Sequence, residues 1–213
     1  MLSRLYPVSL VLQGKKCLVV GGGTVAFRKA EALLEAGAAV TVISPAICDE
    51  LMALDDVDKI ERAFAATDLE GMFLVVGATD SREVNQRVAA EAERRGMLVN
   101  IVDDPSLCNF YVNSGIDRGS LHIGISTGGA SPALAKRIRQ ELEARYGAEY
   151  EVLTRLLREY REKVQQTVDN SSKRRAILAR LADAGLETVI AESGEPAARR
   201  RIEKIIAEES ANG

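Results

Sequence analysis

A glycine-rich segment near the start of the chain has the composition and spacing of a phosphate-binding loop. Residues 21–26 read GGGTVA and directly follow an apolar run, so they fit the pattern G-x-G-x-x-A between a strand and a helix. In that pattern Gly21 permits a tight turn, Gly23 lets the backbone approach a pyrophosphate, and Ala26 packs the helix against the sheet. Amides at the helix N-terminus attract the phosphates. The segment predicts a dinucleotide site contacted by Gly21, Gly22 and Gly23; a tight turn without a ligand is the alternative.

Two later segments end apolar runs with residues that suit the rest of a dinucleotide. Ser44 offers a hydroxyl to a ribose at a position where an acid is expected. No Arg or Lys stands at that turn to neutralise a 2′-phosphate, which favours NAD over NADP. Ala78 and Thr79 end the next apolar run, and their small size would let a nucleotide lie over the sheet edge. A turn that caps the following helix through Asp80 or Ser81 is the other interpretation.

Two adjacent acids follow the apolar run 98–102. Open α/β sheets bind ligands beyond the carboxyl ends of their strands, so Asp103 and Asp104 are expected near the reactive end of a cofactor. Two neighbouring carboxyl groups repel each other when both are ionised, which would make one of them a proton acceptor. Strand neighbours point to opposite faces, however, so the two groups need not meet. A turn capped by an acid before Pro105 is an equal alternative.

A second glycine loop, residues 126–132, reads STGGASP and leads into another predicted helix. Its amides and hydroxyls suit an anion, such as a carboxylate of a substrate. A close crossing of two backbones at a dimer contact is equally compatible with the pattern. The candidate substrate contacts in this loop are Ser126, Thr127, Gly128 and Gly129.

The composition argues against several other classes of protein. The chain has 213 residues, 46% of them hydrophobic, and a net charge of −3, which predicts a globular protein without the broad positive field of a nucleic-acid binder. No apolar run reaches the ~20 residues that span a bilayer, so we expect no membrane association and a cytoplasmic location. One histidine, His122, and three separated cysteines give no multi-histidine metal site, and His122 is expected to be structural.

The elements that must position these residues follow from the hydrophobic pattern. Short β-branched runs alternate with helical periodicity up to residue 103, which predicts a Rossmann-like parallel sheet of βαβ units. Apolar runs at 110–113 and 121–126 flank a turn and predict a hairpin, and several amphipathic helices follow. We therefore predict an α/β fold with a nucleotide-binding domain at 1–112, a hairpin-plus-helix region at 113–148 and a helical region at 149–213.

Four segments together resemble precorrin-2 dehydrogenases, the enzymes that also form the N-terminal part of siroheme synthases. These segments are residues 21–29, 78–80, 100–105 and 126–132, and their order is more specific than any one of them. The resemblance covers residues 1–150 strongly and the helical tail loosely. It implies NAD-dependent oxidation of precorrin-2, a tetrapyrrole polycarboxylate, to sirohydrochlorin. It also implies a homodimer whose residues 113–148 form the dimerisation region. Some family members insert Fe²⁺ as ferrochelatases, so Fe²⁺ is a further candidate substrate.

The resemblance also assigns roles to particular residues. Asp103 stands where the family has its catalytic aspartate, and the family's NAD contacts fall on Thr24, Val25, Pro45 and Ala46. Thr127 replaces a serine of some relatives. Further candidate contacts for the carboxylates of the substrate are Arg28, Lys29, Asn100 and Arg118. The alternative from another functional class is a regulatory dimer that binds NAD without tetrapyrrole chemistry.

Overall fold

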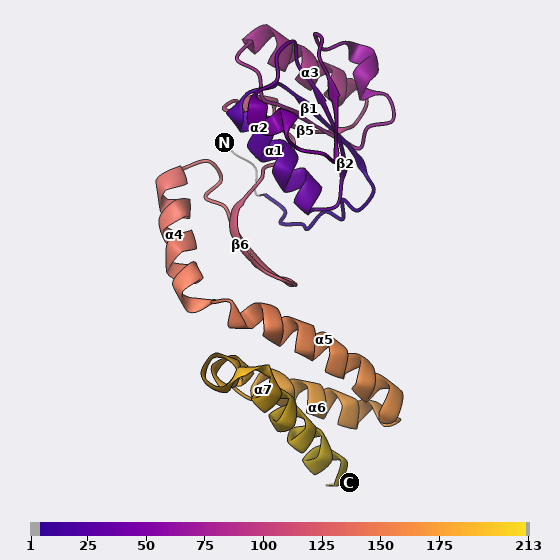
Figure 1. Cartoon of the computed structure of the whole chain (residues 1–213), viewed down its shortest axis with the longest axis vertical. Coiled ribbons are helices and arrows are strands. Elements are labelled where there is room, and N and C mark those ends of the chain that lie inside the picture. Colours follow the sequence, from indigo (N-terminus) through magenta and orange to yellow (C-terminus); the bar gives the residue numbers. More distant parts are fainter. Residues whose placement is uncertain (1–4, 212–213) are drawn as a thin grey trace. The chain divides into compact units, whose positions relative to one another are not determined.

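The structure is a computed structural model that describes residues 5–211, and the chain divides into two compact units, Met1–Val112 and Asn113–Gly213. The first unit is a five-stranded parallel sheet covered by helices on both faces, as Figure 1 shows. Its strands are β1 (Lys16–Val20), β2 (Ala39–Ile43), β3 (Val57–Ile60), β4 (Leu74–Gly77) and β5 (Leu98–Ile101). Its α-helices are α1 (Thr24–Glu35), α2 (Asp49–Met52) and α3 (Arg82–Arg94). The order β3-β2-β1-β4-β5 confirms the predicted Rossmann-like fold.

The sheet is held by two separate hydrophobic layers. Alternate residues of β1 point to opposite faces: Cys17 and Val19 pack with α1 and α2, whereas Leu18 and Val20 pack with α3. All four side chains are at most 2% exposed. A strand buried on both faces reads as a continuous apolar run, which is why the sequence predicted a parallel sheet.

Two helices of this unit end at glycines. Gly37 and Gly96 come just after α1 and α3 and have φ values of 79° and 63°, the left-handed conformation expected of residues that end helices. Two elements had no clear pattern in the sequence. Strand β3 (VDKI) is a half-exposed edge strand and α2 is a single turn, so neither carries enough apolar residues to be recognised.

The second unit begins with a hairpin whose first strand was predicted wrongly. The structure pairs β6 (Ser114–Arg118) with β7 (Leu121–Ile125), whereas the apolar run 110–113 is not a strand. Phe110 instead packs against the core of the first unit, and its carbonyl accepts a hydrogen bond from Asn100. Strand β6 reads SGIDR, so its only large apolar residue, Ile116, gives a weak signal.

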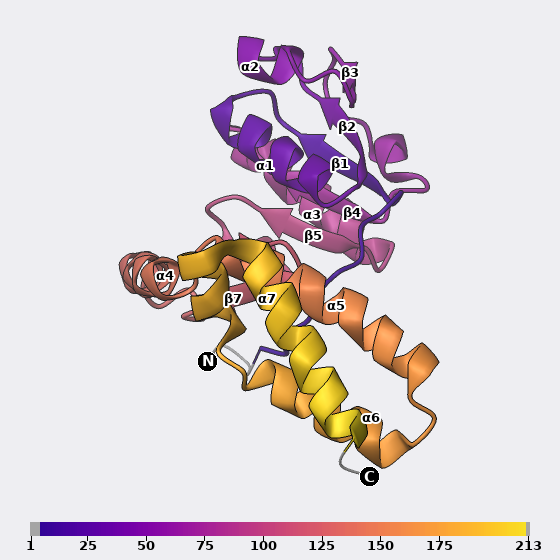
Figure 2. The same ribbon diagram turned by 60° about the horizontal axis from the view of Figure 1, so that its bottom comes forward.

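Four helices follow the hairpin: α4 (Pro132–Arg145), α5 (Glu149–Thr167), α6 (Ser171–Ala182) and α7 (Leu186–Ala211). Figure 2 shows α5, α6 and α7 side by side, and they share one apolar core that includes Leu156, Ile177 and Ile202. Gly194, with φ 75°, interrupts α7 two residues before Pro196. Within residues 5–211 no helix is long and apolar enough to cross a membrane.

Candidate functional site

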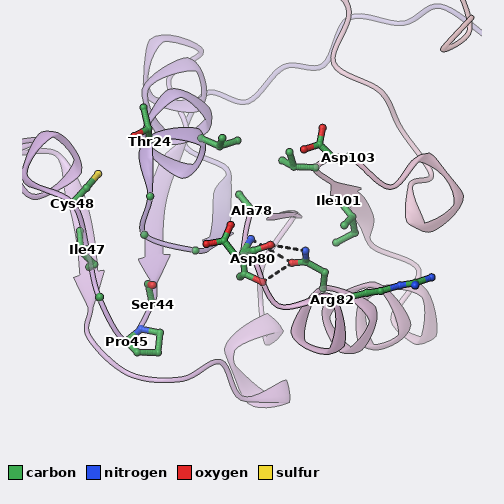
Figure 3. A pocket seen from close by; sticks show the side chains of 18 of the residues that line it. Thr24, Ser44, Pro45, Ile47, Cys48, Ala78, Asp80, Arg82, Ile101 and Asp103 are labelled. Carbon is green, nitrogen blue, oxygen red and sulfur yellow. Dashed lines mark hydrogen bonds between the residues drawn. The ribbon is translucent and has the colours of Figure 1, made fainter.

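A cleft of about 1140 Å³ opens at the carboxyl ends of the strands in the first unit. The register explains its position, because Val20, Ile43, Gly77 and Ile101, which end four neighbouring strands, are paired with one another. The segments after these strands therefore start side by side, as Figure 3 shows. The predicted residues that line the cleft are Gly21, Gly22, Gly23, Thr24, Val25, Ser44, Pro45, Ala46, Ala78, Thr79 and Asp103.

Two of the three glycines are required by neighbouring backbone. A Cβ atom on Gly21, whose φ is 134°, would lie 2.2 Å from the carbonyl oxygen of Ala78. A Cβ atom on Gly22 would lie 1.8 Å from the carbonyl oxygen of Ala46. Gly23 differs, because a Cβ atom there would meet nothing within 4 Å. Gly21 and Gly22 thus allow the segments after β1, β2 and β4 to pack closely together, and Gly23 exposes main-chain atoms to the cleft.

The N-terminus of α1 presents main-chain donors that no side chain satisfies. Gly23 occupies the N-cap position and makes no side-chain hydrogen bond to the first turn of this 12-residue helix. A helix N-terminus carries about half a positive charge, and its first amides need partners from outside the helix. Thr24 and Val25, the first two helical residues, line the cleft. This arrangement suits a phosphate or pyrophosphate group.

The segment after β4 is fixed by a hydrogen-bonded pair of side chains. The Thr79 hydroxyl donates to Oδ1 of Asn85 at 2.9 Å, and Nδ2 of Asn85 donates to the Thr79 carbonyl at 2.8 Å, bonds drawn as dashed lines in Figure 3. Ser81 caps α3 by accepting a bond from the amide of Val84 at 3.3 Å. Of the two predicted caps, Ser81 is the one used, and Asp80 lines the cleft instead.

The two acids after β5 have different hydrogen-bonding partners. Oδ1 of Asp104 accepts bonds from the amide of Ser106 at 3.2 Å and from its hydroxyl at 2.5 Å. The exposed side chain of Asp103 makes no hydrogen bond or ion pair to a residue that the structure describes, although it lines the cleft. Asp103 also has φ 62°, a left-handed conformation that costs a non-glycine residue about 1 kcal/mol. Of the two acids after β5, Asp103 is therefore the one whose carboxylate makes no hydrogen bond to a described residue.

Three other predicted residues of this unit lie outside the lining of the cleft. Asn100 is 8% exposed, and its Nδ2 donates to the carbonyl of Phe110 at 3.1 Å. Arg28 is exposed, while Lys29 is half-buried. Burial lowers the pKa of the Lys29 ammonium, with the charge of Arg28 acting in the same direction and that of Asp103 in the opposite one. The predicted contacts of these three residues with substrate stay predictions.

The second glycine loop belongs to the second unit, and its hydroxyl groups form hydrogen bonds mainly with main-chain groups of the same loop. The Thr127 hydroxyl accepts a bond from the amide of Ser131 at 3.1 Å and donates to its carbonyl at 3.2 Å. The amide of Gly128 donates to the Ser126 hydroxyl at 3.2 Å, and Gly129 has φ 80°. Arg118, in the same unit, donates from Nε to the carbonyl of Tyr146 at 3.0 Å. Their roles toward a substrate also stay predictions.

Several lining residues were not singled out from the sequence as contacts: Ile47, Cys48, Asp80, Arg82, Asn85, Ile101, Val102 and Leu107. Most of them lie within a few residues of a strand end that the sequence did predict. Their position along the chain could therefore have indicated that they line the cleft. Arg82 is the one basic residue in this lining. Within the described residues no group of three or more His, Cys, Asp or Glu side chains has the geometry of a metal site.

The chain is similar to known proteins over both of its units. A family model described as "Putative NAD(P)-binding" matches residues 8–114, and one described as "Sirohaem biosynthesis protein central" matches residues 118–145. A siroheme synthase of Thioalkalivibrio sulfidiphilus is 39% identical over 204 residues, covering 94% of this chain and 42% of the relative. A siroheme synthase of Methylococcus capsulatus is 40% identical over 211 residues, covering 91% and 44%.

A solved structure with the description "SirC, precorrin-2 dehydrogenase" has a TM-score of 0.77 and 31% sequence identity with this chain. That match covers 94% of this chain and 100% of the other. By contrast, the chain spans less than half the length of the two siroheme synthases. The similarity therefore extends over the sheet unit and the helical unit alike.

Proposed function

We propose that this chain, because it belongs to the precorrin-2 dehydrogenase and siroheme synthase family, oxidises precorrin-2 to sirohydrochlorin with a nicotinamide dinucleotide. The observation that carries the proposal is the cleft itself. It joins an uncapped helix N-terminus, two positions where only glycine fits, and the Asp103 carboxylate, which makes no hydrogen bond or ion pair to a described residue.

The residues of the cleft fit a dinucleotide. Gly23 and the first amides of α1 would hold the pyrophosphate, and the Ser44 hydroxyl would hold a ribose. Pro45, Ala46 and Ala78 would form apolar walls beside the nucleotide, and Thr79 is fixed in place by Asn85. A bound nicotinamide ring supplies a hydride acceptor. The protein's own contribution is to bind, to orient and to take up a proton.

Asp103 is the proposed proton acceptor. Conversion of precorrin-2 to sirohydrochlorin removes two electrons and two protons, which leave as one hydride and one proton. The Asp103 carboxylate is exposed to the cleft and free of hydrogen bonds within the described residues, so it is available to take that proton. The Asp104 carboxylate is engaged by Ser106, which makes it the poorer acceptor.

The proposal is tested by following NADH formation and sirohydrochlorin absorbance together after precorrin-2 and NAD are mixed with the protein. We expect equal amounts of both products. Asp103→Ala should lower kcat by ~10²–10⁴-fold while NADH still binds, because general-base catalysis contributes about that much. Asp58→Asn, on the edge strand β3, is the matched control. Binding of NAD without any oxidation of precorrin-2 would favour the regulatory dimer instead.

We propose NAD rather than NADP as the cofactor. The segment Ser44–Cys48 after β2 carries no positive charge for a 2′-phosphate. Arg82 does line the cleft, but Figure 3 shows its side chain extending away from Ser44. The check is the ratio of kcat/KM for the two cofactors, which should favour NAD. A preference for NADP that is lost in Arg82→Ala would assign the 2′-phosphate to Arg82.

Two further proposals concern partners. Insertion of Fe²⁺ into sirohydrochlorin is tested by mixing the protein with Fe²⁺ and sirohydrochlorin in the absence of NAD. Siroheme should form faster than it does without protein.

A homodimer formed through residues 113–148 is tested by the mass of the protein in solution. This proposal rests on the resemblance of residues 113–148 to the dimerisation region of the family.

A further inference from the structure

Asp103 holds a backbone conformation that needs support from its surroundings. Among the described residues it is the one non-glycine residue with a positive φ, 62°. Such a conformation persists only when neighbouring groups hold it, and it is often found where a side chain must be aimed. The turn around Asp103 therefore requires contacts that fix both of its ends.

The thiol of Cys108 makes several of those contacts, beside a main-chain bond in which the amide of Asp104 donates to the carbonyl of Ile101 at 3.4 Å. Its Sγ accepts a hydrogen bond from the amide of Ile101 at 3.1 Å, on one side of Asp103. It lies 3.3 Å from the carbonyl oxygen of Ile101 and also 3.3 Å from that of Asp104, on the other side. Because a thiol carries one hydrogen, these two carbonyl oxygens share a single donor. One side chain thus links the residues before and after Asp103.

Cys108 is itself held against the free edge of β5 by its neighbour Asn109. Oδ1 of Asn109 accepts a bond from the amide of Val99 at 2.8 Å, and Nδ2 donates to the carbonyl of Met97 at 2.7 Å. These bonds cover the edge of the sheet and do not touch the turn that carries Asp103. Asn109 thus anchors the segment, whereas Cys108 contacts the turn.

The surroundings of Cys108 keep its hydrogen on the sulfur. Burial raises the pKa of the thiol, and the charge of Asp104 adds to that rise, while the Ile101 amide and the charge of Lys29 act in the opposite direction. A protonated thiol can donate as well as accept a hydrogen bond. It also reacts poorly as a nucleophile, so a structural use of this cysteine fits its environment better than a covalent one.

We propose that Cys108 is a positioning residue that closes the turn on which Asp103 reaches into the cleft. This inference rests on the proposed function, in which Asp103 accepts the proton. Loss of the thiol would free the turn, and Asp103 would leave the position from which it takes up the proton. A catalytic group displaced by about 1 Å can lose ~10²-fold in rate.

Three substitutions of Cys108 test the proposal in the full-length protein. Cys108→Ala removes the hydrogen bonds, Cys108→Val removes them while filling the space, and Cys108→Ser restores a donor and an acceptor. We expect kcat to fall ~10–100-fold in the alanine and valine variants and to recover most of its value in the serine variant. The dissociation constant of NADH, measured by fluorescence titration, should not change. Asn109→Ala is the matched control, and it should lower the melting temperature and leave kcat unchanged.

The outcomes separate this inference from the proposed function. If Asp103→Ala is inactive but a folded Cys108→Val or Cys108→Ala keeps the kcat of the unaltered protein, Cys108 does not position Asp103. The same conclusion follows if Cys108→Ser loses as much kcat as Cys108→Val, because restored hydrogen bonding then has no effect. If Asp103→Ala is fully active, the proton-accepting role of Asp103 fails, and the role of Cys108 fails with it.

Discussion

Residues 21–26 and residues 126–131 both place adjacent glycines ahead of a helix, but the two loops use their main-chain amides differently. In the first loop the N-cap residue is Gly23, which makes no side-chain bond, and the first turn of α1 is left without a cap. In the second loop Ser131 accepts a bond from the amide of Leu134 at 3.2 Å, and Thr127 bonds both main-chain groups of Ser131. The first loop keeps donors free for an anion, and the second satisfies most of its own.

The glycines themselves differ in the same way. Cβ atoms on Gly21 and Gly22 would collide with the backbone of neighbouring loops, whereas Cβ atoms on Gly128 and Gly129 would meet nothing within 4 Å. In the first loop glycine allows close packing of three segments. In the second it allows a left-handed backbone, with φ of 60° and 80°. The expectation that the first loop binds an anion thus rests on its uncapped helix and not on its glycines alone.

The largest effect that the comparison predicts is that of Gly22→Ala. The added Cβ would lie 1.8 Å from the Ala46 carbonyl, so the loops after β1 and β2 must separate. We expect the affinity for NADH, measured by fluorescence titration, to fall at least ~100-fold, or about 2.7 kcal/mol. Gly128→Ala is the control, and it should cost ~1 kcal/mol of stability because of its positive φ, with no change in NADH affinity. Equal losses of NADH affinity in both variants would remove the distinction between the loops.

A smaller and more selective effect is expected from Gly23→Ala. Its φ of −90° is ordinary and a Cβ atom would meet nothing within 4 Å, so the melting temperature should not change. The new methyl group would stand where a pyrophosphate approaches the backbone, and NADH affinity should fall ~10-fold, or about 1.4 kcal/mol. An unchanged affinity would show that the phosphates do not lie against Gly23, and the first loop would then resemble the second.

The sequence predicted the parts of this molecule where each local signal agrees with the fold. The apolar runs of β1, β2 and β4 and the loop at 21–26 predicted the sheet unit and the positions of its strand ends. It failed at 110–113, where apolar residues pack on a core instead of pairing as a strand. Such a choice depends on contacts with residues far away in the sequence, here the core cluster of the first unit on which Phe110 packs.

The candidate site shows the same division. The glycine pattern and the positions after strands predicted residues 21–23, Ser44, Ala78 and Thr79, whereas Thr24, Val25, Pro45 and Ala46 were assigned through the family resemblance. The difference between Asp103 and Asp104 was not predicted, because it depends on the bonds that Ser106 makes and on the left-handed turn. The link from Cys108 back to Ile101 was equally invisible, since a single cysteine in a loop carries no pattern.

The second loop can be weakened without touching the first. Ser131→Ala removes the hydroxyl that caps α4, and loss of an N-cap costs about 1 kcal/mol of stability. Chemical denaturation should show that loss, and the dissociation constant of NADH should equal that of the unaltered protein. A fall in NADH affinity would mean that the cap of α4 supports the nucleotide site. That result would contradict the expectation that only the first loop affects NADH binding.

The smallest effect is expected from Thr127→Val, which keeps the shape of the side chain and removes its hydroxyl. The hydroxyl makes two bonds to the main chain of Ser131 and is half-buried, so the loss should be ~1 kcal/mol of stability or less. NADH affinity should again be unchanged, and a decrease would contradict the comparison. The KM for precorrin-2, measured on the same variant, tests whether the second loop contacts the substrate. A rise in KM at unchanged NADH affinity would assign substrate carboxylates to the second loop, and an unchanged KM would confine the role of Thr127 to holding that loop closed.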